Sequence, residues 1–265
     1  MTNNQGASNG LEDIIKCIKE INIILFLSFG DLYARYKNSI LGPLWISLGT
    51  GIFIFGLALL WGELFNKDRA SFVPSMTVGL IMWHFISACL YESTMIYINK
   101  SFLIKNIKLP LFMFPLQVVI KQLINFFHNF LIFIIVFIIF DLKFNLYMLY
   151  FFPLMILFIL NMLWITLFLS ILGARFRDFS FVISSILPLL FFMSPVLYSP
   201  KDINFLKPVL WINPFSHLIE IVKAPLIGNN VELFSVLFSV LFMIFGWLFT
   251  IFLFNRIRNK IIFWV

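Results

Sequence analysis

Side chains that could do chemistry are few in this chain and stand far apart. The histidines, His84, His128 and His217, are scattered rather than set beside carboxylates at catalytic spacing. His217 and Glu220 lie three apart on one predicted short helix, where a polar face beside water is a better interpretation than a proton or metal site. Glu92 is an acid well inside an apolar run, so it is a functional candidate, although it could also reach the nearby membrane surface. We therefore expect no catalytic residue and no metal site.

Two further kinds of site are missing from the sequence. No phosphate-binding loop of the GxxxxGK[ST] type occurs, so the chain has no visible means of hydrolysing ATP itself. The two cysteines are Cys17, in a predicted cytoplasmic segment, and Cys89, in an apolar run. Neither a disulfide nor metal-ligand spacing is expected from such a pair.

A chain of this composition needs lipid as the solvent for most of its surface. Of its 265 residues, 62% are hydrophobic and 12% are charged, and the mean hydropathy is +1.01. Soluble domains carry about 25% charged residues, and a soluble core cannot absorb this much apolar surface. The net charge of +7 could suggest nucleic acid, but the basic residues stand at the ends of apolar runs and not in one patch. They therefore indicate orientation in a membrane.

Continuous apolar runs predict an all-α membrane protein with six transmembrane helices. A bilayer core about 30 Å thick needs about 20 apolar residues in a helix, whereas transmembrane β-strands would be about 10 residues long with strict alternation. We expect a disordered tail over residues 1–10, followed by a single transmembrane domain over residues 11–265. The six spans are expected near residues 44–62, 72–98, 116–140, 146–172, 179–198 and 233–255.

The stretch RYKNSILGPLW at residues 35–45 marks where the chain meets the membrane. Basic and aromatic residues precede a Gly-Pro pair, and no charged residue then follows until Glu63. If the chain starts inside, Lys and Arg favour the inner loops by about two to one, so both termini are expected in the cytoplasm. Gly49, Gly51 and Gly56 in the first span would permit either close helix packing or a flexible wall.

Two segments are predicted to lie in the membrane without crossing it. Residues 11–35 begin with apolar and charged residues on opposite faces of a helix, which is typical of a membrane-interface helix; packing on a soluble partner is the alternative. Residues 203–227 are apolar but interrupted by Pro208, Pro214 and Pro225. Two short helices in a re-entrant hairpin from the outer face fit this pattern. Such backbone survives at membrane depth only where protein or water covers it.

Two predicted cytoplasmic loops combine basic and apolar residues. Residues 99–115, NKSFLIKNIKLPLFMFP, place Phe102 and Ile107 among lysines, and GARFRD occupies residues 173–178. Basic residues in such loops are usually only orientation signals. Apolar residues exposed beside them predict docking to another protein.

Four stretches together resemble a known family. They are RYKNSILGPLW, GARFRD, MSPVLYSP at residues 193–200 and NPFSHLIEIVKAPLIG at residues 213–228. Each is a weak signal alone, but in this order they resemble the membrane subunit of type-2 ABC exporters for polysaccharides. The resemblance is strongest to O-antigen export permeases and covers the chain from about residue 20 to residue 255.

The resemblance implies a homodimer of six-span subunits in the bacterial inner membrane, with two separate ATPase subunits that would bind ATP and Mg²⁺. This chain would be a transport subunit without cofactors, and the substrate a polyprenyl-diphosphate-linked polysaccharide, O-antigen, moved to the periplasm. Residues 99–115 and GARFRD resemble the contacts with the ATPase, residues 11–35 the interface helix, and residues 203–227 the periplasmic gate hairpin. The matching ATPase-coupling residues are Lys100, Phe102, Lys105, Lys108, Arg175, Arg177 and Asp178, and those of the hairpin are Asn213, Pro214, His217 and Glu220.

A glycan also needs a water-filled path, and aromatic rings can stack on the apolar faces of sugars without holding them tightly. The alternative for each Trp or Tyr is a belt at the membrane interface. The lipid diphosphate requires cations at the cytoplasmic entrance, where ordinary charge bias is the alternative. The candidates to line the path are Trp45, Trp61, Trp83, Tyr91, Tyr97 and Tyr198, and those for the entrance are Tyr33, Arg35, Tyr36 and Lys37.

Other functions remain as alternatives. A capsular polysaccharide or teichoic acid exporter would have the same architecture. A membrane enzyme acting on lipid-linked sugars would need clustered acids at one membrane face, and the acids here are dispersed. A secondary transporter should show inverted repeats and interior charges, which the sequence does not display.

Overall fold

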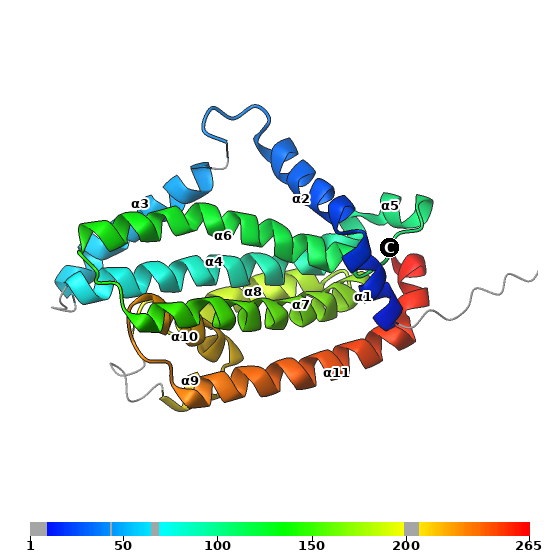
Figure 1. Ribbon diagram of the computed structural model, residues 1–265. Helices are drawn as coiled ribbons and strands as arrows, with labels where there is room; N and C mark the ends of the chain where they lie inside the picture. Colours follow the sequence, from blue (N-terminus) through cyan, green and yellow to red (C-terminus); the bar gives the residue numbers. More distant parts are fainter. Residues whose placement is uncertain (1–9, 43, 65–68, 199–206) are drawn as a thin grey trace, which may run out of the picture.

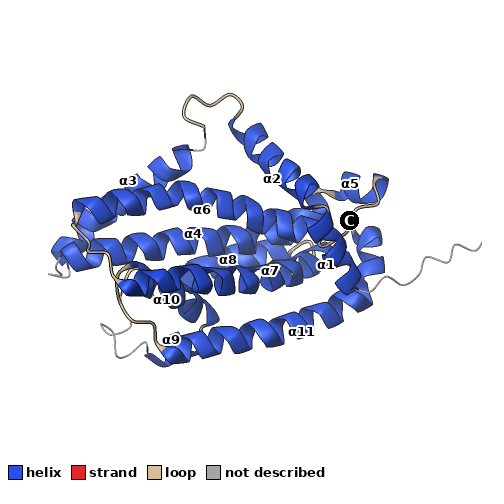
Figure 2. Ribbon diagram, viewed as in Figure 1, coloured by secondary structure: helices blue, strands red, loops and turns tan. Residues whose placement is uncertain are grey.

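The computed structural model describes residues 10–42, 44–64, 69–198 and 207–265, and these form helices joined by loops (Figure 1). The side chains of residues 11, 35, 61–64 and 207–209 lie outside this description. Figure 2 shows no strand among the described residues. The prediction of an all-α protein is confirmed over this part of the chain.

The helices differ widely in length, because the long apolar runs are interrupted by short segments rich in Pro, Gly and charge. In chain order they are α1 Gly10–Lys19, α2 Ile21–Tyr36, α3 Leu44–Leu64, α4 Arg69–Asn99, α5 Ser101–Asn106, α6 Met113–Ile139, the 3-10 helix η1 Leu146–Tyr150, α7 Phe151–Arg175, α8 Phe179–Phe192, α9 Lys207–Ile212, α10 Pro214–Leu226 and α11 Leu233–Trp264.

The long helices α4, α6, α7 and α11 run along the length of the molecule together with α8 (Figure 1). One end of this bundle holds α1, α5 and the C-terminus, and we call it the terminal end. The opposite end, which we call the hairpin end, holds α9, α10 and the start of α11. α4 packs on α3, α6, α7, α8 and α10 and is the most deeply buried of the long helices. The core of the protein therefore follows α4.

Four helical stretches are long and apolar enough to cross a membrane: Arg69–Asn99, Met113–Ile139, Leu146–Arg175 and Leu233–Trp264. They correspond to the expected spans at 72–98, 116–140, 146–172 and 233–255. The expected span at 44–62 lies within α3, which has 21 residues and whose described side chains form an apolar stretch over Leu44–Leu60. The expected span at 179–198 contains the shorter apolar helix Phe179–Phe192. Over the described residues, four of the six expected spans therefore meet both the length and the hydropathy needed to cross a membrane.

The fifth expected span, residues 179–198, is shorter than predicted. α8 ends at Phe192, and its 14 residues reach about 21 Å, less than the roughly 30 Å of a bilayer core. Residues 193–198 turn instead, and Pro195 lies among them without a backbone N–H to continue a helix. The apolar run of the sequence thus continues past the end of the helix.

The expected interface helix over residues 11–35 is two helices in the structure. Glu20 lies between α1 and α2 with φ −101° and ψ 25°, outside helical geometry. α1 carries the amphipathic sequence pattern, but it buries the face that holds Asp13 and Cys17, whereas Ile15 and Ile18 are exposed together with Glu12. α2, Ile21–Tyr36, is apolar over Ile21–Ala34 and packs on α6. The amphipathic period therefore belongs to the first ten residues of the segment and not to all of it.

The two short helices expected in residues 203–227 are present as α9 and α10 (Figure 1). Asn213 stands between them in an extended conformation, and Pro214 occupies the first turn of α10, where its missing N–H costs no helical hydrogen bond. Gly228, with φ +77°, ends the segment in a conformation that favours glycine. Residues 203–206 of the predicted hairpin lie outside the described residues.

Close helix packing occurs at Gly173 of α7 and not at the three described glycines of α3, Gly49, Gly51 and Gly56. A Cβ on Gly173 would lie 1.9 Å from the carbonyl oxygen of Thr94 in α4. The absent side chain lets these two backbones approach closely. An added Cβ on Gly49 or Gly56 would meet nothing within 4 Å, and one on Gly51 would meet only the Ile132 side chain at 3.9 Å. Within this chain, the α3 glycines therefore do not mediate tight packing.

Candidate functional site

A polar cavity that is partly open to the surface lies between α4, α6 and the beginning of α3. Gln122, Asn125 and Asn129 interrupt the apolar sequence of α6 at intervals of three and four residues, so their side chains share one face of the helix. The cavity beside this face has a volume of about 340 Å³. We call it the amide cavity, and it is lined by Ile46, Ile81, His84, Phe85, Ala88, Tyr91, Glu92, Gln122, Asn125, Phe126 and Asn129.

The amides of this cavity are only partly satisfied by the protein. Asn125 donates a hydrogen bond of 2.8 Å from Nδ2 to Oε1 of Gln122. The Nε2 atom of Gln122 and the Oδ1 atoms of Asn125 and Asn129 are buried without a hydrogen-bond partner among the described residues. Leaving a buried polar group unpaired costs about 1–3 kcal/mol. The cavity therefore offers both donors and acceptors to water or to a hydroxyl group.

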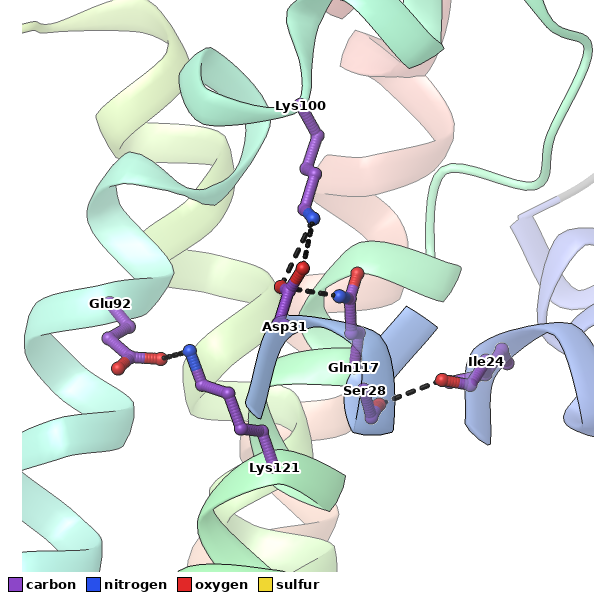
Figure 3. A network of polar contacts seen from close by, with 7 residues as sticks. All are labelled: Ile24, Ser28, Asp31, Glu92, Lys100, Gln117 and Lys121. Carbon is purple, nitrogen blue, oxygen red and sulfur yellow. Dashed lines mark hydrogen bonds and ion pairs between the residues drawn. The ribbon is translucent and has the colours of Figure 1, made fainter. Parts of the chain in front are cut away.

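An ion pair borders the amide cavity on the side nearer the terminal end. Glu92, one of the lining residues, pairs with Lys121 of α6 (Figure 3). The side chains are 25% and 17% exposed, respectively. A partly buried carboxylate is much less costly when a cation neutralises it. The charge of Glu92 is therefore paired within the bundle, and its side chain does not have to reach the membrane surface.

A second polar group lies close to this pair and joins α2 to the bundle (Figure 3). Asp31 of α2 accepts hydrogen bonds of 2.9 and 3.1 Å from Nζ of Lys100 and one of 2.8 Å from Nε2 of Gln117. Lys100 directly precedes α5, and Gln117 lies early in α6. One carboxylate therefore connects α2 to both sides of the α5 segment. The Lys100 side chain, predicted to contact an ATPase, is bound to Asp31 within this chain.

Asp13 of α1 performs a similar role at the terminal end. Its carboxylate pairs with Arg258 of α11 at 2.9 Å and accepts a hydrogen bond of 3.0 Å from the backbone N–H of Phe112. The side chain of Asp13 is 1% exposed. Cys17 is buried on the same helix, and burial first, then the charges of Asp13 and Glu20, raises the pKa of its thiol to about 12. α1 is therefore fixed to the beginning of α6 and the end of α11.

The terminal end also carries exposed apolar and basic side chains on α5 and the loop after it. Phe102 is 75% exposed and Ile107 is 50% exposed, and Lys105 and Lys108 are exposed beside them. Ile104 faces inward and is buried. We call Phe102, Lys105, Ile107 and Lys108 the docking surface. It combines the residues on which the prediction of a protein contact was based.

The GARFRD loop lies at the same end of the bundle. Arg175 stacks over the ring of Trp264, with 5.1 Å from its Cζ atom to the ring centroid, and lies 6.0 Å from the ring of Phe176. Arg177 and Asp178 are exposed. The predicted coupling residues of the two loops are thus found at one end of the molecule, which also holds the C-terminus (Figure 1).

At the hairpin end, Asn213 and His217 hold α10 in place. Asn213 accepts from the backbone N–H of Phe215 at 3.0 Å, and its Nδ2 donates to the carbonyl of Met193 and the hydroxyl of Ser194. His217 is buried, with Nε2 3.1 Å from the carbonyl oxygen of Trp211 and Nδ1 3.1 Å from the hydroxyl of Ser235. A carbonyl only accepts, so Nε2 carries the proton and Nδ1 accepts from the hydroxyl. Both polar residues thus have structural partners.

Burial also lowers the pKa of His217, so the ring is neutral in this position near pH 7. Glu220, the carboxylate predicted to share its helical face, lines a neighbouring pocket of about 200 Å³ together with His217, Glu232 and Trp211. Pro214 occupies the first turn of α10. The four predicted hairpin residues are therefore brought together on one short helix and its cap.

The predicted path-lining aromatics are separated in the structure. Tyr91 lines the amide cavity, and Trp45 is 55% exposed on α3. Trp83 and Tyr97 are buried in the bundle, where Trp83 packs against Phe191 and the Tyr97 hydroxyl donates to the Leu111 carbonyl at 3.2 Å. Tyr198 is partly buried, and its hydroxyl donates to the Phe192 carbonyl at 3.1 Å. The side chain of Trp61 lies outside the described residues.

The predicted entrance residues stand where α2 ends. Tyr33 is 70% exposed, Lys37 is exposed and Tyr36 is partly exposed, whereas the side chain of Arg35 lies outside the described residues. Figure 1 shows the loop after α2 standing away from the bundle, between its two ends. The entrance candidates are therefore separate from both the docking surface and the hairpin.

The amides of α6 are the feature that the sequence reasoning missed. Gln122, Asn125 and Asn129 fall within an expected span. They are neither charged nor aromatic, so they were not among the candidates predicted from the sequence. Their spacing in the sequence could have indicated the cavity, because amides spaced three and four residues apart in an apolar run share one face of a helix. An amide inside a membrane helix needs a partner, so such a face indicates a polar contact or a polar cavity.

Comparison with known proteins agrees with this architecture. A sequence model described as "ABC-2 type transporter" matches residues 24–227. An O-antigen export system permease protein from Myxococcus xanthus is 25% identical over 219 residues, which cover 80% of this chain and 84% of that protein. Two proteins of the same name from Klebsiella pneumoniae are 22% identical over 76% of this chain and 77% of theirs, and 23% identical over 90% and 93%. The family match spans most of the multi-pass helical bundle described above, and the chain belongs to the ABC-2 type transporter family.

Proposed function

We propose that this chain is the membrane subunit of an ATP-driven exporter that moves polyprenyl-diphosphate-linked O-antigen from the cytoplasm to the periplasm. The observation that carries the proposal is similarity, over at least 76% of this chain, to proteins named as O-antigen export permeases. ATP hydrolysis belongs to a separate subunit in this scheme, because the sequence has no phosphate-binding loop.

The docking surface is the site proposed for the ATPase, and the terminal end is proposed to face the cytoplasm. Exposed Phe102 and Ile107 supply apolar contact area, and Lys105 and Lys108 supply charge that would steer an acidic cleft. Arg177 and Asp178 are exposed at the same end and are proposed to form a second contact with the ATPase. The basic bias of these segments supports this orientation.

The exporter is proposed to be a homodimer of this chain with two ATPase subunits in the inner membrane. Two apolar helices support self-association: α3 exposes Ile52 and Phe55, and α8 exposes Phe181 and Leu189. α8 is also too short to fill a bilayer alone, and a short hydrophobic segment can be accommodated by oligomerisation. Tyr33, Arg35, Tyr36 and Lys37 are proposed to receive the lipid diphosphate.

Deletion of the gene from its host, followed by analysis of surface glycan, tests this function. We expect surface O-antigen to be lost while lipid-linked polymer accumulates inside the cell, with both restored by the wild-type gene. Loss of capsule or teichoic acid instead would indicate a different glycan handled by the same architecture. Unchanged surface glycan with no internal polymer would contradict the proposal.

A further inference from the structure

We infer that the amide cavity binds one sugar unit through its hydroxyl groups. The inference rests on the proposed export function for the identity of the glycan, but its structural basis is independent. Gln122 Nε2 is a donor without a partner, and the Oδ1 atoms of Asn125 and Asn129 are acceptors without partners. A sugar hydroxyl both donates and accepts, so neighbouring hydroxyls can satisfy both kinds of group at once.

Burial makes the unsatisfied amides informative. Gln122, Asn125 and Asn129 are 3%, 9% and 3% exposed, so bulk water does not compensate them as it would at a surface. The next hollow along α6 has a different lining. It lies between α3 and the part of α6 from Leu131 to Ile139, and its walls are almost entirely apolar side chains. Of these two neighbouring hollows, the amide cavity is therefore the one that offers amide groups to a hydroxyl.

The remaining walls suit the flat face of a sugar ring. Phe85, Tyr91 and Phe126 line the cavity, and Tyr91 is 48% exposed, so a ring could reach it. Sugars present C–H groups on one face and hydroxyls at their edges, which matches aromatic walls beside amides. The volume of about 340 Å³ corresponds to about ten waters at roughly 30 Å³ each. This is enough space for one sugar unit.

Charge favours a neutral ligand held weakly. Glu92 and Lys121 neutralise each other at the border of the cavity, so they offer no unpaired charge to an ion. Hydrogen bonds between neutral groups are much weaker than those to charged groups. A site of this kind can recognise a sugar unit and then release it, which a transport path requires.

The experiment uses the full chain, purified and placed in lipid nanodiscs. The probe is dodecyl maltoside carrying a photoreactive diazirine on its sugar headgroup, and labelled peptides are mapped by mass spectrometry. Competitors are unmodified dodecyl maltoside and octaethylene glycol monododecyl ether, which has the same alkyl chain without sugar hydroxyls. The test variant is Asn125→Leu with Asn129→Leu. The control is His128→Leu on the same helix, because His128 does not line the cavity and its Nδ1 lies 2.8 Å from the carbonyl of Ile124 in its own helix.

We expect labelling of the α6 peptide around residues 122–129 that the maltoside displaces and the glycol ether does not. The double Leu variant should lose this labelling by about tenfold, which is the effect of removing two modest hydrogen bonds. Its thermal unfolding temperature should change little, because the variant removes two unpaired buried acceptors but also the hydrogen bond from Asn125 to Gln122. This separates lost binding from lost folding, and His128→Leu should label like the wild type.

Three outcomes would overturn the inference: no labelling of α6 in the wild type, equal displacement by the glycol ether, or full labelling of the double Leu variant. Equal displacement would indicate a cavity that holds water and detergent without recognising sugar. An export assay distinguishes this failure from failure of the proposed function. If the wild-type gene restores surface glycan while the labelling criteria fail, the export function stands and the sugar site does not.

Discussion

Lys223 of α10 donates a hydrogen bond of 2.8 Å from its Nζ to the carbonyl oxygen of Pro195, and both residues are buried. The same ammonium lies 3.4 Å from the carbonyl oxygen of Tyr198. Residues 193–198 follow the end of α8 and do not continue its helix, so their carbonyls need other donors. Lys223 supplies one such donor and holds the turn after α8 against α10.

Replacing Lys223 with Met should release this turn while keeping the apolar part of the side chain. A hydrogen bond from a charged donor contributes about 1.5–3 kcal/mol, so we expect destabilisation of that order. Hydrogen exchange of residues 193–198 should become faster in Lys223→Met. Lys143→Met changes an exposed lysine and serves as the control. Identical exchange in this turn for the two variants would show that Lys223 does not hold it.

Charge reversal on the docking surface should weaken association with an ATPase subunit. Lys105→Glu with Lys108→Glu replaces two exposed cations beside Phe102 and Ile107. Because rim charges mainly affect the association rate and its salt dependence, we expect at least a severalfold lower yield of ATPase on co-purification at moderate salt. Lys143→Glu reverses a single charge on an exposed residue of another loop, between α6 and η1. Equal co-purification for both variants would argue against this surface as the contact.

A methyl group added at Gly173 should disturb the contact of α7 with α4. The new Cβ would lie 1.9 Å from the Thr94 carbonyl oxygen, and overpacking of this kind costs about 1–3 kcal/mol or more. Gly56→Ala is the matched control, because open space surrounds that position in α3. There the helix preference for Ala should raise stability by about 0.5–1 kcal/mol. Thermal unfolding in detergent measures both, and a Gly173→Ala variant as stable as Gly56→Ala would contradict the packing described here.

Breaking the Asp13–Arg258 pair should undock α1 and make Cys17 reactive. In the folded protein Cys17 is 0% exposed and the pKa of its thiol is about 12, so a maleimide should react slowly even at pH 8. Arg258→Gln leaves the Asp13 carboxylate without this ion pair, which costs about 3–5 kcal/mol for a well-buried pair and less at this partly exposed one. We expect faster labelling of Cys17 in a Cys89→Ala background.

The choice of Arg258→Gln over Asp13→Ala keeps the carboxylate that helps raise the pKa of the thiol. Faster labelling would therefore report loss of burial of Cys17, which exposes the thiol and lowers its pKa, and not removal of the neighbouring Asp13 charge. Glu12→Ala removes an exposed neighbouring acid on the same helix and should leave labelling slow. Slow labelling in both variants would mean that the ion pair is not required to dock α1.

Acid should destabilise the protein through His217. Its pKa in the folded protein is lowered from 6.5, chiefly because burial disfavours the charged ring. As pH falls through about 6.5, the unfolded chain takes up a proton that the folded protein resists, so stability is lost. Thermal unfolding between about pH 7.5 and pH 5.5 should show a fall in wild type that is smaller in His217→Asn. An equal fall in both would assign the acid sensitivity to other groups.

The apolar pattern of the sequence predicted the helices well because lipid requires long continuous runs. The spans around α4, α6 and α7 were placed to within a few residues, whereas α11 begins at Leu233 as expected but continues to Trp264, past the expected end at residue 255. The end of α8 at Phe192 was not predicted, because residues 193–198 carry no charge and continue an uncharged, largely apolar stretch. Only their hydrogen bonding to Lys223 and Asn213 shows that they turn. A hydropathy pattern does not distinguish a buried turn from a continuing helix.

The polar contacts of the site were less predictable because they join distant parts of the sequence. Asp31 and Lys100 are 69 residues apart, and Asp13 and Phe112 are 99 apart. The distribution of charge predicts the side of the membrane on which these residues lie, but it does not predict the residues with which they pair. The same limit applied to Lys100, which was predicted to face an ATPase and is held by Asp31. Pairing of this kind follows from the packing of helices and not from local patterns.

The Asp31 network has a mechanical consequence for the whole molecule. The α5 segment is attached at one end to Lys100 and at the other to the start of α6, and a single carboxylate on α2 is bound to both sides. Displacement of α5 would therefore act on these hydrogen bonds and, through Asp31, on α2. Asp31 thus connects α2, and the loop that follows it, to the α5 segment at the terminal end.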